Sequence, residues 1–322
     1  MFFGNLIVLI SLLAFAGFDA HAQMPRVGIL IPEMGRAESQ TNRGFKEELT
    51  RLGYQDRKNI FFEIRNAKRD RAAFQSAADD LVRQKVEVIL TSGASATRSA
   101  AAASLDIPIV FIYAGDPALA GFGQGPNATN MNITGVAALA REKMEIRLAL
   151  LKEIIPALRT LHIFFDWNNR YSRDNFARVE NVTKKNGLQA LGHPIKSIEE
   201  LNATIEGFDS ERGDAIFQIP DDLIESAAQR IFNLARKKKI PTMFNEEVYA
   251  IKGALAAYGP NYRQMGRQAA QLVVNILSGR KPDSIPIEQA SKFDLTLNYR
   301  TASFIGINLT QEIIDKADKV IR

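Results

Sequence analysis

The chain has 322 residues, of which 46% are hydrophobic and 24% are charged, so it can bury one or two sizeable cores. It contains no cysteine, which excludes disulfides, thiolate metal sites, cysteine nucleophiles and a lipid-modified N-terminal cysteine. The formal net charge is +5, but the basic residues are scattered apart from the run 236–239, which we interpret as a solvated helix end. Because no basic patch is predicted, we expect no nucleic-acid partner.

The first 22 residues differ from the rest of the chain. An unbroken run of apolar and small residues, 6–18, is followed by Ala20-His21-Ala22, a small-x-small site before Gln23. This pattern predicts a signal peptide, residues 1–22, cleaved near Ala22-Gln23. A membrane anchor is the alternative, but the run is shorter than the roughly 20 residues that span a bilayer. We therefore expect an exported, periplasmic protein.

Strand and helix patterns alternate from residue 27 onward and begin again after residue 141. Such β-α-β-α order implies parallel sheets with helices on both faces, here in two similar halves joined near residues 132–140. In the first half we expect strands at 27–31, 60–64, 86–90 and 107–113, and helices at 40–52, 71–84 and 94–103. In the second half we expect helices at 144–155, 174–186, 198–205 and 223–239, and strands at 161–165, 189–193, 215–219 and 241–244.

The last part of the chain does not predict a third domain. It contains an apolar strand pattern at 254–258, a helical pattern at 262–277 that ends at Ser278-Gly279, and a late strand at 293–298. A chain that crosses back between two lobes would use these elements to complete the two sheets. We expect that arrangement here.

Residues typical of catalysis are sparse. His162 and His193 occupy strand positions without metal-ligand spacing, so we interpret them as packed histidines. The glycine-rich stretch 121–125 is followed by Pro126-Asn127 rather than by a helix, which favours a plain loop over a phosphate site. We therefore expect no enzyme, no cofactor and no metal site.

Candidate ligand-binding residues lie at the carboxyl ends of the predicted strands, where ligands bind in parallel α/β sheets. The loop Ser92-Gly93-Ala94-Ser95 lets the backbone approach a ligand, and the N–H groups of the next helix favour an anion such as a carboxylate. Capping by Ser92 or Ser95 is the alternative. The other strand ends supply Gly115, Asp116, Trp167, Tyr171, Ser172, Asp221 and Asp222.

Several of these side chains have a second interpretation. Asp116 precedes a proline and could form a turn, and Asp221 or Asp222 could cap the following helix. Trp167 and Tyr171 could stack on a planar ligand or cover the lobe surface. If carboxylates of one lobe face backbone N–H donors of the other, the two sets of groups together would suit a zwitterion such as an amino acid. The hypothesis is that the 92–95 amides bind the carboxylate and Asp221 or Asp222 binds the amine.

The motifs taken together resemble a known family. They are the run 107–111 (IPIVF) with Gly115-Asp116-Pro117, the segment Asn132-Ile133-Thr134-Gly135, the segment 253–259 (GALAAYG) with Tyr262 and Gly266-Arg267, and the tail from 276 to Phe293. This set is similar to that of the ABC-transporter substrate-binding proteins of the tryptophan/tyrosine-type group. The likeness runs from about Arg26 to Leu309, nearly the whole chain after the signal peptide.

The resemblance implies an α/β, type I periplasmic-binding fold: two Rossmann-like lobes with parallel sheets, joined by three crossovers. The expected N-terminal lobe comprises residues 23–138 plus about 258–285, and the C-terminal lobe 139–257 plus about 286–322. The loop 92–95 corresponds to the family's small-residue loop that meets the ligand. Tyr171-Ser172 and Asp221-Asp222 correspond to second-lobe loops facing the cleft, and Glu246, Tyr258 and Tyr262 lie near the hinge.

The resemblance also implies a function. We expect a monomeric binding protein that captures a small organic solute by hinge closure and delivers it to an inner-membrane ABC permease. An amino acid or similar carboxylate, aromatic or branched, is the expected ligand. The alternative is a sensory binding protein that presents its ligand to a receptor kinase. Two departures from the family pattern, Trp167 and the first loop at residues 33–36, leave the ligand class open.

Overall fold

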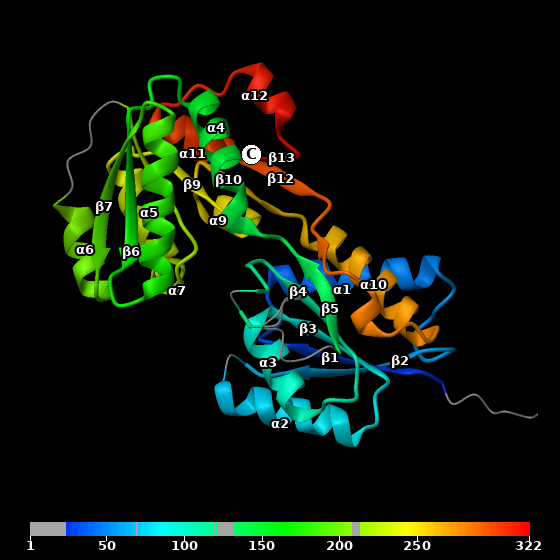
Figure 1. The fold of residues 1–322 in the computed structure, drawn as a ribbon. Coiled ribbons are helices and arrows are strands. Elements are labelled where there is room, and N and C mark those ends of the chain that lie inside the picture. Colours follow the sequence, from blue (N-terminus) through cyan, green and yellow to red (C-terminus); the bar gives the residue numbers. More distant parts are fainter. Residues whose placement is uncertain (1–23, 69, 119, 122–131, 208–212) are drawn as a thin grey trace, which may run out of the picture.

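The computed structural model describes residues 24–68, 70–118, 120–121, 132–207 and 213–322 (Figure 1). The predicted signal peptide and most of the glycine-rich stretch 121–125 lie outside the described residues. The described chain forms two lobes, each with one sheet between two layers of helices, as Figure 1 shows. The predicted two-lobed α/β class is confirmed. No helix in the described part of the chain is long and apolar enough to cross a membrane.

The sheet of the first lobe is parallel throughout, with the strand order β11-β5-β4-β3-β1-β2. Parallel pairing brings all the carboxyl ends of its strands to one edge, where Ser92 lies beside Ile112. Its strands are β1 (Arg26–Ile31), β2 (Phe61–Asn66), β3 (Val88–Ser92), β4 (Ile109–Tyr113), β5 (Ile133–Ala137) and β11 (Glu288–Gln289).

Four helices of the described chain cover the two faces of this sheet. Apolar residues at helical spacing, such as Phe45 and Leu49, turn inward onto one core, and Phe74, Ala78 and Leu81 turn onto the other. The helices of the first face are α1 (Arg36–Arg51) and α10 (Tyr262–Leu277), and those of the second face are α2 (Arg71–Arg83) and α3 (Gly93–Ala103). A short 3₁₀ turn, η2 (Pro282–Ser284), precedes β11.

The second lobe has the strand order β13-β12-β10-β9-β8-β6-β7, and only the pair β10 and β12 is antiparallel among the described pairs. Apart from this pair the second sheet is parallel, in agreement with the predicted parallel sheets. Its strands are β6 (Thr160–Asp166), β7 (Gln189–Ile195), β8 (Asp214–Phe217), β9 (Thr242–Phe244), β10 (Ala256–Pro260), β12 (Phe293–Asn298) and β13 (Lys319–Ile321).

Helices again pack on both faces of this sheet. One core is covered by α4 (Met144–Ile154), which follows the turn η1 (Ala140–Lys143), with α5 (Arg170–Lys185), α11 (Tyr299–Ile305) and α12 (Gln311–Lys316). The other core is covered by α6 (Ile198–Glu206), α7 (Asp222–Ser226), α8 (Ala228–Lys237) and α9 (Glu247–Lys252).

The chain crosses between the lobes three times, from β5 to α4, from β10 to α10 and from β11 to β12. We expected lobe boundaries at about 258 and 285, but β10 pairs with the second sheet as far as Pro260 and β11 pairs with β5 at 288–289. The two later crossings therefore follow Pro260 and Gln289, because backbone pairing holds each strand to its sheet for a few residues longer.

Other differences concern short elements. The expected linker 132–140 contains β5, and the expected helix 223–239 is divided into α7 and α8 at Ala227. We did not predict α9, α11, α12, β11 or β13. Each of these spans seven residues or fewer, too few for periodicity to stand out.

The contact between α1 and α10 fixes the position of the second crossing. A Cβ added to Gly44 would lie 1.8 Å from the Arg263 carbonyl oxygen, and one added to Gly266 would lie 2.1 Å from the Thr41 carbonyl oxygen. The two backbones therefore touch, and only glycine fits at either position. Gly266, part of the family motif, is a packing residue.

We expect Gly266→Ala to lower the free energy of unfolding by about 1–3 kcal/mol or more, because the helices must separate to admit the methyl group. Urea denaturation measures this loss. Gly207→Ala is the control: its Cβ would lie 3.3 Å from the Ala203 carbonyl oxygen at the end of α6, and its effect should stay below about 1 kcal/mol. Equal stability of the Gly266→Ala and wild-type proteins would contradict the proposed close contact.

Candidate functional site

A cavity of about 190 Å³ lies between the lobes, at the carboxyl ends of both sheets. Its first-lobe wall is formed by residues at and after the end of β4, and its second-lobe walls by residues that follow β6, β8 and β9. The lining residues are Tyr113, Ala114, Gly115, Asn169, Tyr171, Pro220, Asp221, Glu225, Asn245 and Glu246. Of the predicted site residues, Gly115, Tyr171, Asp221 and Glu246 meet here.

The first-lobe wall depends on a glycine beside a tyrosine. A Cβ at Gly115 would lie 2.5 Å from the ring of Tyr113, so the ring occupies the space that a side chain at 115 would need. Asp116 does not line the cavity. Its carboxylate accepts a hydrogen bond from the Ala118 N–H at 2.8 Å, the turn-forming alternative considered above.

The loop 92–95 lies at the same sheet edge but outside this cavity. Ser92 ends β3, and Gly93 begins α3 with a φ of +84°, which favours glycine. The Ser92 side chain makes no capping hydrogen bond to α3. Instead, the Thr97 hydroxyl donates to the Gly93 carbonyl at 2.9 Å and fixes the turn. Ser92 borders a crevice of only about 10 Å³, whereas Gly93, Ala94 and Ser95 line neither this crevice nor the cavity between the lobes.

Asp221 lines the cavity, but its carboxylate is engaged by the backbone. It accepts hydrogen bonds from the Asp166 N–H at 2.7 Å and the Ile224 N–H at 3.1 Å, and the residue is 4% exposed. Asp221 therefore caps α7 and ties it to the end of β6. The side chain of Asp222 lies outside the described part of the structure.

The two predicted aromatic residues of the second lobe occupy different positions. Asn169 caps α5 by accepting from the Tyr171 N–H at 2.9 Å, and this places Tyr171 in the cavity wall. Trp167 is 49% exposed, lies outside the cavity, and faces the guanidinium of Arg173 at 5.8 Å. Ser172 is fully buried beneath the wall and is no lining residue.

Of the lining residues, sequence reasoning did not select Tyr113, Ala114, Asn169, Pro220, Glu225 or Asn245. The first four lie in loops at strand ends that were considered, but Glu225 and Asn245 were overlooked altogether. Glu225 comes four residues after Asp221, and that spacing places both on one side of the short helix α7. Asn245 directly follows β9, so the strand-end rule that selected the other candidates applies to it as well. Both signals were present in the sequence.

Glu246 joins the cavity to the hinge. Its carboxylate accepts a hydrogen bond at 2.8 Å from the hydroxyl of Tyr262, the first residue of α10. Burial raises the pKa of Glu246 above its usual range, and the Tyr262 hydrogen bond opposes this only in part. Burial, together with the nearby Glu246, raises the pKa of Tyr262 well above its usual value. Tyr262 thus remains a donor, and Glu246 holds its proton to a higher pH than an exposed glutamate.

Comparison with known proteins identifies the family. Residues 26–321 match the family described as ABC transporter substrate binding protein. The chain belongs to this family.

The chain is similar to a relative in sequence and to solved structures in fold. A tyrosine-binding protein of Clostridioides difficile is 26% identical over 262 residues, which cover 81% of this chain and 75% of the relative. A ligand-free, open substrate-binding protein with adhesive properties from Clostridium difficile has a TM-score of 0.77 at 23% identity, covering 92% of this chain and 99% of that one. A Streptococcus pneumoniae ABC domain in complex with L-Trp has a TM-score of 0.76 at 21% identity, with the same coverage.

A second cavity, of about 300 Å³, lies on the hinge side of this substrate-binding protein. Arg36 of α1 donates to Glu247 of α9 at 2.9 Å, and Lys319 of β13 donates to the same carboxylate. Burial raises the pKa of Glu247, but these two donors outweigh it, so the pKa lies below its usual range. Glu247 is therefore an ionised link between the lobes. Tyr258 packs against Phe293 at 5.7 Å and lines neither cavity.

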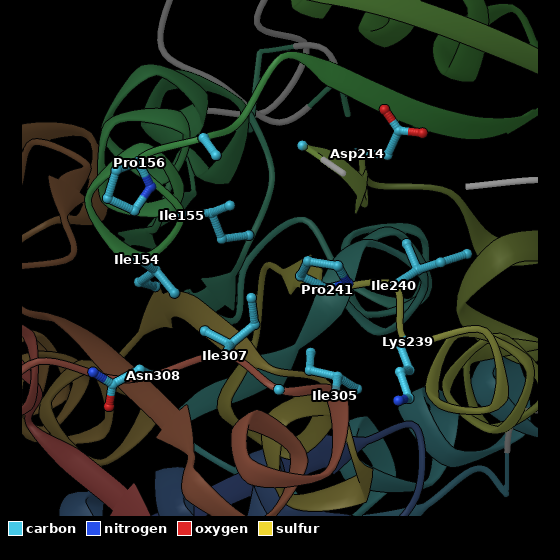
Figure 2. Close-up of a pocket in the computed structure, with 13 residues that line it drawn as sticks. Ile154, Ile155, Pro156, Asp214, Lys239, Ile240, Pro241, Ile305, Ile307 and Asn308 are labelled. Carbon is cyan, nitrogen blue, oxygen red and sulfur yellow. The ribbon is translucent and has the colours of Figure 1, made fainter. Parts of the chain in front are cut away.

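A further cavity, of about 350 Å³, is distant from the cleft. It lies within the second lobe at the amino ends of its strands, beside Asp214, which begins β8. Figure 2 shows isoleucine and proline side chains around it, with Asp214 and Lys239 on the opposite side from Ile154 and Pro156. A ligand here would contact one lobe only, so it would not favour closure. We therefore assign the candidate site to the smaller cavity between the lobes.

The raised pKa of Glu246 makes the stability of the hinge pH-dependent. Folding raises the pKa of this carboxyl group above its value of 4.5 in the unfolded chain. Its contribution to stability is therefore complete below pH 4.5 and is lost as the pH rises through the pKa of the folded protein. Glu246→Gln keeps the acceptor for Tyr262 and does not ionise. We expect the thermal midpoint of the wild type to fall relative to that of Glu246→Gln as the pH rises above 4.5.

Differential scanning fluorimetry between pH 4 and pH 9 measures this difference. Glu145 is an exposed residue of α4, so Glu145→Gln is the control for the loss of one carboxylate. Its thermal midpoint should depend on pH in the same way as that of the wild type. Parallel curves for wild type and Glu246→Gln would show that burial does not hold the proton on Glu246.

Proposed function

We propose that this protein binds a free amino acid between its lobes and delivers it to an inner-membrane ABC importer. The observation that carries the proposal is the composition of the cavity. Tyrosines from opposite lobes, Tyr113 and Tyr171, line it together with the carboxylates of Asp221, Glu225 and Glu246, and none of its described lining residues is lysine or arginine. An acidic, aromatic cavity suits a ligand with an ammonium group and an apolar or aromatic side chain.

The first lobe supplies backbone N–H groups that would complement the carboxylate of such a ligand. The first-turn N–H groups of α3, at residues 93–95, follow β3. The neighbouring strand β4 ends at Tyr113, two residues before Gly115. A ligand carboxylate suits such N–H groups. A zwitterion that spans both lobes would bind the closed form more tightly than the open form, and this difference is what drives closure. We therefore propose that Gly115, which lines the cavity, and the loop 92–95, which lies at the same sheet edge outside it, hold the carboxylate once the lobes close.

Two of the related proteins support an amino acid as the ligand. One is described as tyrosine-binding and another was solved with L-Trp. The apolar run 6–18 and the small-x-small site support export to the periplasm through a cleaved signal peptide. We further propose that the exported protein acts as a monomer, since the site is complete within one chain.

A thermal-shift screen tests the class of ligand. We expect L-tyrosine, L-tryptophan or another apolar L-amino acid to raise the melting temperature, because a ligand at 100 times its Kd stabilises the folded state by about 2.7 kcal/mol. Sugars, nucleobases and dicarboxylates should give no shift. A shift with one of these and with no amino acid would contradict the proposal.

Tyr171→Ala tests the aromatic wall. Loss of ring contact and apolar burial should cost about 1.4 kcal/mol or more, which corresponds to a tenfold weaker Kd for L-tyrosine. Isothermal titration calorimetry measures it. Trp167→Ala removes an exposed ring outside the cavity and is the matched control, for which we expect a Kd within about twofold of the wild type. The reverse order of effects would place the ligand against Trp167 instead.

A further inference from the structure

The hydrogen-bond acceptors in the second-lobe wall of the cavity differ in their partners. Side chains that accept a hydrogen bond from the protein itself are Asn169, Asp221, Glu225 and Glu246. Asn245 differs from them. It lines the cavity and is 7% exposed, and its side-chain carbonyl oxygen is buried with no hydrogen-bond donor among the described residues. A buried acceptor without a donor is costly, so at a cavity wall it favours a ligand that brings the donor.

The backbone at Asn245 is held by its neighbours. A Cβ added to Gly259 of β10 would lie 2.0 Å from the Asn245 carbonyl oxygen, so the two backbones touch and only glycine fits at this position. The next residue, Glu246, accepts the hydrogen bond from Tyr262. Asn245 therefore lines the cavity from a fixed backbone, and little freedom remains to be lost when a ligand binds.

Asn245 lies at the hinge end of the cavity. It follows β9, which pairs with β10 on the hinge side and is separated from β6 by β8. Neighbouring strands lie about 4.8 Å apart, so the loops that follow β9 and β6 begin roughly 10 Å apart. Tyr171 belongs to the second of these loops. A ligand whose aromatic ring packs on Tyr171 therefore has its polar end near Asn245.

The lining at this end favours an ammonium group over a carboxylate. Asp221 and Glu246 place carboxyl groups in the same wall, and none of the described lining residues is lysine or arginine. A ligand carboxylate would be buried there without a cation, which is costly. An ammonium group has three N–H donors and no acceptor, so it supplies the donor that the Asn245 oxygen lacks.

We propose that the side-chain carbonyl of Asn245 accepts a hydrogen bond from the ammonium group of the ligand and thereby selects amino acids over carboxylates that lack the amine. This inference rests on the proposed function and makes it more specific. Asp221, which the sequence favoured for this role, caps α7 instead. The amine is then recognised through a neutral amide, with the carboxyl groups of the wall as its acidic surroundings.

Asn245→Leu tests the role of the oxygen, because leucine keeps the branched shape of the side chain and removes the acceptor. The melting temperature of the ligand-free protein should stay the same or rise, since no hydrogen bond within the described protein is lost. The Kd for L-tyrosine should rise at least tenfold, since a ligand donor is left without its acceptor. Scanning fluorimetry and calorimetry on the chain after the predicted signal peptide measure the two effects. Asn233→Leu, at an exposed position of α8, is the matched control and should keep the Kd within about twofold.

Two further comparisons identify the ligand group that Asn245 meets. Asn245→Asp keeps an acceptor oxygen, so its Kd for L-tyrosine should stay within about threefold of the wild type or fall. Tyramine, which lacks the carboxylate, should lose affinity in Asn245→Leu as L-tyrosine does. In contrast, 3-(4-hydroxyphenyl)propionate, which lacks the amine, should bind equally to Asn245→Leu and the wild type. Should Asn245→Leu fail to fold, Asn245→Ala removes the same oxygen and is measured with the same probes.

The outcomes separate the two proposals. An unchanged Kd for L-tyrosine without the Asn245 oxygen, or a loss of affinity for the propionate but not for tyramine, would overturn the role of Asn245 and leave the amino-acid proposal standing. A wild-type protein that binds none of the amino acids would overturn both.

Discussion

The cleft depends on the direction of the two parallel sheets. In each lobe, parallel pairing brings the carboxyl ends of the strands to one edge, and the three crossings hold those two edges face to face. Every lining residue of the cavity follows or ends a strand at such an edge. The touching backbones of α1 and α10 at Gly44 and Gly266 hold α10 at a fixed place on the first lobe. Tyr262, at the start of α10, therefore reaches Glu246 of the other lobe.

Carboxylates that look alike in the sequence take different roles through their neighbours. Backbone N–H groups make Asp221 a cap, burial makes Glu246 a proton-holding hinge group, and two cations make Glu247 an ionised link between lobes. Residue type alone does not distinguish them, because the pKa of each depends on burial and on nearby charges. The chemistry of this cleft is thus determined by the packing of the second lobe.

The sequence was sufficient for the lobes and for most of their long elements. Apolar periodicity located α10 and β12 at their observed bounds, because long or strongly alternating patterns leave a clear signal. Short elements such as α9 and β13 depend on tertiary contacts instead, and the antiparallel pairing of β10 with β12 follows from a crossing that local pattern does not encode. Several loops that the strand-end rule selected line the cavity between the lobes. Local hydrogen bonds decide which role a side chain of these loops takes. The carboxylates of Asp116 and Asp221, both candidate ligand contacts, accept hydrogen bonds from nearby backbone N–H groups instead.

The hinge also bears on the energy of closure. Glu247 joins Arg36 of the first lobe to the second lobe in this conformation, and Glu246 bonds to Tyr262 beside it. Both contacts lie next to the crossings, where a rotation of one lobe displaces atoms least. They can therefore persist as the lobes move, and they restrict the motion to a hinge about this side of the molecule. The cavity lies on the other side of Glu246, and Tyr113 and Tyr171 line it from opposite lobes. On the proposed function, the free energy of closure would come from ligand contacts made by such residues.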